Sequence, residues 1–191
     1  ANCETHCYKP AMRERVRECG LPLVYTHLVG GQDEMVFEGH SFVVDPRAEI
    51  AGRAPSFQEK LYYASVSRSA GAIEIEAGML PERSRDADLW DALVLGVRDY
   101  IGKNGFPGVL LGLSGGIDSA LVLAVAVDAL GRDRVRAVMM PSPYTADISW
   151  IDARDMAARL GVRYDEISIL PEFEAFKASL APQFAGLPDD T

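Results

Sequence analysis

The first part of the chain combines one helical stretch with short runs of β-favouring residues. Residues 11–19 are charged and helical in pattern, and Gly20 follows them as a helix-ending residue. Turn signals at residues 29–32 and 45–47 separate the runs. The predicted strands are residues 22–28, 41–45 and 61–66. This order predicts a helix, a strand, a long loop and then antiparallel strands.

From about residue 85 the pattern changes to a regular alternation of helices and apolar strands. The helices are expected at residues 88–103, 118–130 and 147–160, and the strands at 108–113, 135–140 and 162–169. Gly131 and Gly161 directly follow two of these helices, where glycine favours termination. Strands separated by helices of this length predict a parallel sheet with right-handed crossovers.

A glycine loop, Ser114-Gly115-Gly116, joins the strand at 108–113 to the helix at 118–130. The strand is apolar on both faces, as expected of a central parallel strand. The free N–H groups of the helix's first turn, together with the helix dipole, form a site for an anion. Because the glycines have no side chains, a ligand can come close to the backbone of the loop. The loop lacks the lysine of a Walker loop and the G-x-G-x-x-G spacing of a dinucleotide fingerprint.

Asp118 lies inside this predicted anion site. A carboxylate beside phosphate oxygens is repulsive unless a cation lies between them, so Asp118 predicts a divalent metal, Mg²⁺. The alternative is a glycine-rich turn that binds no ligand.

Residues 114–119 resemble the pyrophosphate loop of the N-type ATP pyrophosphatases, which split ATP between its α and β phosphates. The wider stretches 112–128, 138–142 and 144–149 resemble the synthetase domain of glutamine-dependent NAD synthetases, except that Pro143 stands where we expect arginine. The resemblance implies Mg²⁺ binding by Asp118. It implies that ATP is bound by Gly112, Leu113, Ser114, Gly115, Gly116, Ile117, Asp118, Ser119 and Met140.

The stretch 24–45 resembles the late part of a nitrilase-like glutaminase domain. Together the two resemblances imply an α/β protein. Its first part belongs to a nitrilase-like α/β sandwich, and a doubly wound parallel sheet of the Rossmann-like, adenine nucleotide alpha hydrolase-like ATP pyrophosphatase type follows. We expect the glutaminase part at residues 1–76, a linker at 77–88 and the synthetase part at 89–191.

The implied function is ATP-dependent amidation of deamido-NAD to NAD through an acyl-adenylate, with ammonia from glutamine and release of AMP and pyrophosphate. The family's catalytic glutamate, lysine and cysteine are expected upstream of residue 1. The remainder of the synthetase domain is expected beyond residue 191, so this chain alone should be inactive. Two alternatives remain open: another adenylating amidotransferase of the superfamily, forming GMP or asparagine, and a non-catalytic ATP-binding module.

The composition of the chain limits the classes of partner that the protein is expected to bind. The net charge of −9 argues against nonspecific nucleic-acid binding, which needs a basic surface. No apolar run reaches the roughly 18 residues of a membrane span. Three cysteines clustered near the start are a poor disulfide framework and suit a reducing compartment, so we expect a cytoplasmic protein. For the full-length protein we expect small-molecule substrates and a homo-oligomer.

Several other residues have less favoured functional interpretations. Cys3 and Cys7 could bind a metal with Cys19 or His27, and Cys3 could be a nucleophile, but an ordinary thiol is the preferred interpretation. Gln32, Asp33 and Glu34 could line a glutamine pocket or an ammonia path, or form a solvated turn. Asp45 is interpreted as a turn residue rather than a catalytic one. Residues 83–88 are expected to be a solvated linker, and Leu89, Leu93, Val97 and Tyr100 to pack in the core. Helix caps are expected at Asp147, Ser149 and Asp152, with contact to the nucleotide as the alternative.

Overall fold

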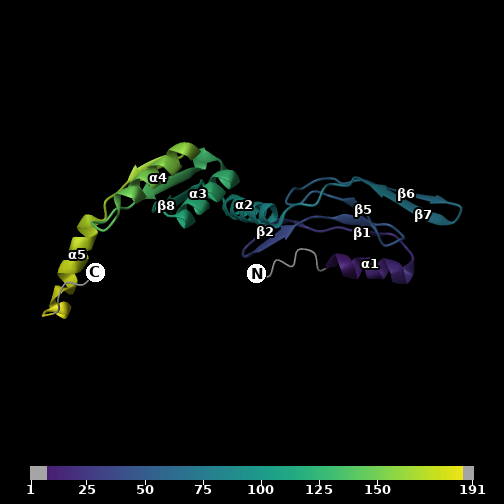
Figure 1. Ribbon diagram of the computed structural model, residues 1–191, viewed down its shortest axis with the longest axis horizontal. Helices are drawn as coiled ribbons and strands as arrows, with labels where there is room; N and C mark the ends of the chain where they lie inside the picture. Colours follow the sequence, from purple (N-terminus) through teal and green to yellow (C-terminus); the bar gives the residue numbers. More distant parts are fainter. Residues whose placement is uncertain (1–7, 187–191) are drawn as a thin grey trace. The chain divides into compact units, whose positions relative to one another are not determined.

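The structure is a computed structural model that describes residues 8–186. The chain forms two compact units, Ala1–Tyr100 and Ile101–Thr191, each with its own secondary structure (Figure 1). Among the described residues, no helix is both long and apolar enough to cross a bilayer.

The first unit contains a helix packed on a small antiparallel sheet. Helix α1 (Tyr8–Cys19) ends as predicted at Gly20, whose N–H donates to the carbonyl of Val16 at 2.8 Å. The sheet has the order β1-β4-β5, with β1 at Leu23–Tyr25, β4 at Phe42–Val44 and β5 at Ile50–Arg53. Its core consists of Val16, Phe42, Val44 and Ala48. The predicted helix and antiparallel strands are confirmed, whereas β5 has no counterpart among the predicted strands.

Two hairpins complete the first unit. One pairs β2 (Val29–Gln32) with β3 (Met35–Glu38), and the other pairs β6 (Ala64–Ser69) with β7 (Ala72–Ala77). The predicted turn at 29–32 is therefore wrong: these residues are a strand, and the turn follows at Asp33, which has a φ of 52°. The strand expected at 61–66 begins at Ala64.

Helix α2 (Arg85–Lys103) buries a different face from the one that its apolar stripe predicts. Leu89, Leu93 and Tyr100 are 41%, 53% and 52% exposed, whereas Val94 and Leu95 are buried. The prediction that this stripe forms core is therefore wrong for those three residues. The buried face includes a carboxylate, Asp88, which forms an ion pair with Arg83.

Asp45 is a turn residue, as predicted. Its carboxylate accepts hydrogen bonds from the N–H groups of Arg47, at 3.0 Å, and Glu49, at 2.9 Å. Burial by itself would raise the pKa of Asp45, but these bonds and the Arg47 guanidinium together lower it below its usual value. A carboxylate stabilised in this way supports the turn between β4 and β5.

Replacement of Asp45 by alanine should lower the free energy of unfolding by about 1–2 kcal/mol at neutral pH, because two backbone donors lose their acceptor. The folded-state pKa lies below the unfolded value. This contribution is therefore complete above the unfolded pKa of about 4 and is lost as the pH falls through the folded pKa. Denaturant unfolding of wild type and Asp45→Ala across this pH range measures the difference. A difference that does not depend on pH would contradict the role of the charge.

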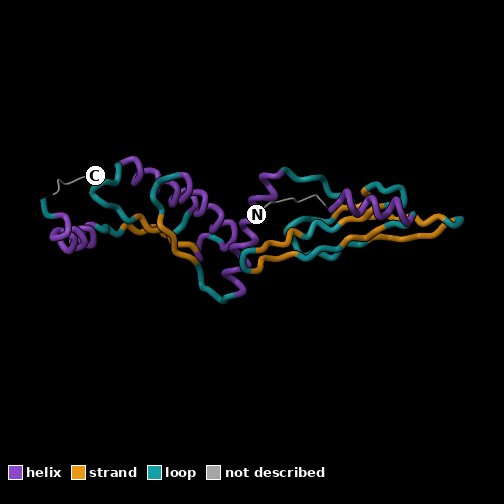
Figure 2. The backbone as a smooth tube through the Cα atoms, turned by 90° about the horizontal axis from the view of Figure 1, so that it is seen from below, coloured by secondary structure: helices purple, strands orange, loops and turns teal. Residues whose placement is uncertain are grey.

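The second unit is built on a parallel sheet with the order β10-β9-β8, where β8 is Val109–Gly112, β9 is Val135–Met139 and β10 is Arg163–Glu166. Both strand pairs are parallel, which confirms the predicted sheet. Helices α3 (Ile117–Leu130) and α4 (Asp147–Leu160) connect the strands in this alternating order (Figure 2). The short η1 (Arg132–Arg134) precedes β9, and α5 (Leu170–Leu180) and η2 (Ala181–Phe184) follow β10.

The core of the second unit lies between the sheet and helices α3 and α4. It centres on Leu113, Leu123, Ala137 and Ala153, each no more than 1% exposed. In the described part of the chain, β9 is the central strand and β8 is an edge strand with Leu110 65% exposed. The prediction of a central position for residues 108–113 is therefore wrong within this chain.

Candidate functional site

The glycine loop lies at the carboxyl end of β8, directly before α3. The pairing of Gly112 with Val138 places the end of β8 beside the end of β9. Met140 follows β9 at this edge, and a Cβ added to Gly112 would lie 3.1 Å from the Met140 methyl carbon. The structure thus brings the predicted residues 112–119 and Met140 together at one sheet edge.

Gly115 is the position in this loop where only glycine fits. Its φ of +81° lies in the left-handed region, which side chains other than glycine rarely adopt. A Cβ there would lie 2.3 Å from the carbonyl oxygen of Ser149. The loop backbone therefore approaches the first turn of α4 more closely than any side chain would allow.

The two serine hydroxyls of the loop hydrogen-bond within it. The N–H of Ser114 donates to Ser119 Oγ at 3.2 Å, and Ser119 Oγ in turn donates to the carbonyl of Gly116 at 2.9 Å. The N–H of Gly116 donates to Ser114 Oγ at 3.3 Å, and the two hydroxyl oxygens lie 3.0 Å apart. These bonds set the loop's shape, while Ser114 remains exposed.

The first turn of α3 presents backbone donors and one carboxylate. Gly116 is the N-cap and has no side chain to bond the first N–H groups, which leaves them available to an anion. Asp118 lies in this first turn and is exposed. Among the described residues, no group of three or more histidine, cysteine or acidic side chains is placed to hold a metal ion. A single carboxylate, that of Asp118, beside a site for phosphates fits a cation such as Mg²⁺. This ion commonly binds one or two carboxylates and completes its coordination shell with phosphates and water.

A hollow of about 410 Å³ opens beside the loop. The loop and α3 contribute Leu113, Gly115, Gly116, Ile117 and Ala120, and α4 contributes Asp152, Ala153, Asp155, Met156 and Arg159. Within it Arg159 Nε lies 2.6 Å from Asp155 Oδ2. The hollow therefore has polar groups on the α4 side and backbone donors on the loop side.

Side-chain capping of α4 by Asp147, Ser149 and Asp152 is a wrong prediction. The N-cap is Ala146, and no side chain caps the helix. The preceding turn is instead held by Thr145, whose Oγ1 accepts from the N–H of Ser142 at 3.0 Å. Pro143 lies in this turn, so the arginine expected at that position is replaced by a residue without a polar side chain.

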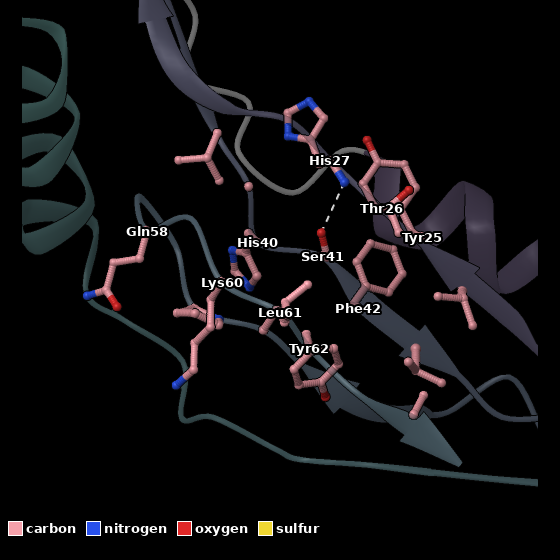
Figure 3. A pocket seen from close by; sticks show the side chains of 17 residues that line it. Tyr25, Thr26, His27, His40, Ser41, Phe42, Gln58, Lys60, Leu61 and Tyr62 are labelled. Atoms are coloured by element: carbon pink, nitrogen blue, oxygen red, sulfur yellow. Dashed lines mark hydrogen bonds between the residues drawn. The ribbon is translucent and has the colours of Figure 1, made fainter. Parts of the chain in front are cut away.

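A second hollow, of about 270 Å³, lies in the first unit between β1, β4 and the loop at residues 54–64 (Figure 3). Its labelled side chains include His40, Lys60 and Tyr62, and the N–H of His27 donates to Ser41 Oγ at 3.0 Å. Lys9 Nζ lies 3.5 Å from His40 Nε2, and burial lowers the pKa of this lysine.

The structure describes some of the other residues that the sequence offers as site candidates. Gln32, Asp33 and Glu34 are exposed at the β2–β3 turn and do not line the second hollow, which favours the solvated turn. Cys19 is a free, exposed thiol. Cys3 and Cys7 lie outside the described residues, so their suggested metal and nucleophile roles remain untested hypotheses.

Family models match both parts of the chain. Residues 8–72 match the carbon-nitrogen hydrolase model, and residues 89–190, more than half of the chain, match the NAD synthase model. Hydrolase-type and synthase-type segments therefore follow one another in a single chain.

Individual relatives match almost the whole chain. A glutamine-dependent NAD(+) synthetase from Acinetobacter baylyi is 42% identical over 94% of this chain and 33% of its own length. One from Xylella fastidiosa is 45% identical over 97% of this chain and 34% of its own length. The solved glutamine-dependent NAD+ synthetase of Acinetobacter baumannii, in complex with adenosine diphosphate, is 43% identical. It superposes with a TM-score of 0.91 over 98% of this chain and 36% of that chain. This chain therefore spans about a third of the length of these relatives.

Proposed function

The chain belongs to the NAD synthase family, and we propose that it is part of a longer enzyme that makes NAD from deamido-NAD, ATP and glutamine. The observation that carries the proposal is the Ser-Gly-Gly-Ile-Asp-Ser loop at an uncapped helix N-terminus, in a chain that also holds a hydrolase-type segment. The loop suits ATP, and the hydrolase-type segment suits glutamine as the source of ammonia.

The proposed chemistry has two steps. An oxygen of the nicotinate carboxylate attacks the α-phosphorus of ATP, the bond to the pyrophosphate oxygen breaks, and an acyl-adenylate forms. Ammonia then attacks the acyl carbon, the bond from that carbon to the AMP oxygen breaks, and the attacking nitrogen loses a proton to leave the nicotinamide. The first step brings two anions together and expels a third, so its demand is charge stabilisation that is in place before reaction.

The chain's own residues supply this charge stabilisation because they lie around the site of the phosphates. The N–H groups of Gly115 and the first turn of α3 hold the phosphates that leave as pyrophosphate. The N–H of Gly116 joins them by exchanging its long bond to Ser114 Oγ for a phosphate oxygen. Gly112 and Met140, at the two strand ends, border the rest of the nucleotide. Asp118 would hold Mg²⁺ at this end of the loop. Such a metal would supply positive charge to offset the negative charge of the phosphates.

We also propose that the full-length enzyme is a cytoplasmic homo-oligomer whose partners are these small molecules rather than nucleic acid. The net charge of −9 supports the last point, because nucleic-acid binding favours a basic surface.

The test uses the full-length enzyme with ATP, Mg²⁺ and ammonia, and varies the acceptor, whose reacting group is a carboxylate or a ring carbonyl. Deamido-NAD should give AMP and pyrophosphate in equal amounts with the NAD formed. Xanthosine monophosphate and aspartate, the acceptors of the GMP- and asparagine-forming enzymes, should give none. Turnover with either of these in place of deamido-NAD would overturn the proposed substrate. ATP binding without any turnover would favour a non-catalytic module.

A further inference from the structure

Helix α2 lies where the chain passes from the segment that matches the carbon-nitrogen hydrolase model to the segment that matches the NAD synthase model. Most of its length lies in the synthase-type match, which begins at residue 89. Nevertheless the helix up to Tyr100 belongs to the first compact unit, together with the hydrolase-type segment. The chain then continues from α2 into β8 and the glycine loop. The contacts that hold α2 on the hydrolase-type segment are therefore of functional interest.

One contact joins α2 to the β2–β3 hairpin through a buried glycine. The N–H of Gly31 donates to Asp99 Oδ2 at 2.7 Å, although the two residues are 68 positions apart in the chain. Gly31 is buried, and a Cβ on it would lie 3.2 Å from both Asp99 Cβ and Gly96 Cα. Glycine at 31 and glycine at 96 thus let the helix approach the hairpin backbone, and the carboxylate fixes the two together.

The other end of α2 is held by arginines. Arg53 of β5 donates to the carbonyl of Leu80 at 2.8 Å and to Glu82 at 2.9 Å, so the segment before α2 runs along β5. Arg83 then pairs with Asp88 at 2.8 Å and also with Asp91, and Asp88 is 7% exposed. The expectation that residues 83–88 are solvated is therefore wrong for Asp88. At this end the hydrolase-type segment therefore holds the residues just before the helix, and Arg83 joins those residues to the helix itself.

We propose that Asp99 is a positioning residue that couples ammonia supply to NAD formation, by holding the Gly30–Gly31 backbone of the hairpin against the helix that leads into the ATP-binding segment. The inference rests on the proposed function. Asp99 touches no substrate in this account. It acts through the backbone of Gly31, which it holds with a charge-assisted hydrogen bond.

Loss of this hydrogen bond should uncouple glutamine hydrolysis from NAD formation rather than slow both reactions. The Asp99→Ala enzyme should use ammonia added to solution almost as fast as wild type, because the glycine loop is unchanged. With glutamine as donor, the ratio of glutamine hydrolysed to NAD formed should rise by roughly threefold or more, a range typical of mutations that alter coupling between sites. Asp99→Asn keeps an oxygen acceptor for the Gly31 N–H and should restore a ratio close to wild type.

Gly31→Ala tests the same contact from the hairpin side. Its added Cβ would push against the backbone of Gly96, so this variant should also raise the ratio. The double variant should fall short of the combined single effects, because both changes disrupt one contact. Asp86→Ala is the matched control, since it removes an exposed carboxylate from the first turn of the same helix.

All variants are assayed as full-length enzyme, with thermal melting recorded for each. A glutamine-to-NAD ratio in Asp99→Ala equal to that of wild type would overturn the role of Asp99, as would equal losses of glutamine- and ammonia-dependent rates. These outcomes leave the proposed function intact. Absence of deamido-NAD amidation in the unaltered enzyme would instead refute the proposed function itself.

Discussion

Asp118→Asn in the full-length enzyme should lower the rate of Mg²⁺-dependent pyrophosphate release by about 100-fold or more, the effect typical of losing a preorganised charge stabiliser. The substitution keeps the size of the side chain and all the backbone donors of the loop. A neutral amide oxygen is a weaker ligand for Mg²⁺ than a carboxylate, so the cation beside the phosphates should be lost or displaced. Folding should change little, because Asp118 is exposed.

The measurement supplies ammonia directly, so that glutamine hydrolysis does not influence the rate. Asp128→Asn, a change of the same kind on an exposed residue of α3, is the matched control and should react at close to the wild-type rate. A role limited to the helix dipole predicts a different result for Asp118→Asn: a stability loss of at most about 1 kcal/mol with a near-normal rate at saturating Mg²⁺. That result would show that Asp118 is not a metal ligand.

Gly115→Ala should be the most disruptive single change in the loop. Alanine at a φ of +81° is strained, and its Cβ would lie 2.3 Å from the Ser149 carbonyl oxygen, which belongs to backbone and has little freedom to move. We expect the free energy of unfolding to fall by about 2 kcal/mol or more. We also expect ATP binding to be lost, because the loop cannot keep its shape.

Gly116→Ala is the control for this prediction. Gly116 has a φ of −87°, which alanine adopts readily, and its added Cβ would come no closer than 3.5 Å to Ser114 Oγ. Denaturant unfolding compares the stability of the two variants, and calorimetric titration compares ATP binding by Gly115→Ala with that by wild type. If Gly115→Ala were as stable as Gly116→Ala and bound ATP as tightly as wild type, the close packing of the loop on α4 would not matter.

The second unit could be predicted largely from sequence because its signals are local. An apolar run, a glycine loop and a helix ended by Gly131 lie within about two dozen consecutive residues, and residues 147–160 form the predicted helix α4 with the same bounds. The close packing of the glycine loop on the first turn of α4 could not be predicted from the sequence. That Gly115 must be glycine follows from Ser149, which is distant in sequence and near only in the folded unit.

The first unit was harder to predict because its glycines are explained by contacts between distant segments. Gly30 and Gly31 have the composition of a turn, yet they form strand β2, where Gly31 makes room for α2. The apolar stripe of α2 likewise indicated the wrong face, since the face that packs on the hairpin carries Gly96 and Asp99. No local pattern marks a carboxylate whose partner is a backbone N–H 68 residues away.

The central claim is that this chain carries the ATP loop of an enzyme that activates a carboxylate by attack on the α-phosphorus. Deamido-NAD labelled with ¹⁸O in its nicotinate carboxylate tests this directly, in the full-length enzyme with ATP and ammonia. The account predicts one ¹⁸O atom in each AMP released, because the attacking carboxylate oxygen leaves with the adenylate. Label in inorganic phosphate together with ADP, or unlabelled AMP, would contradict it.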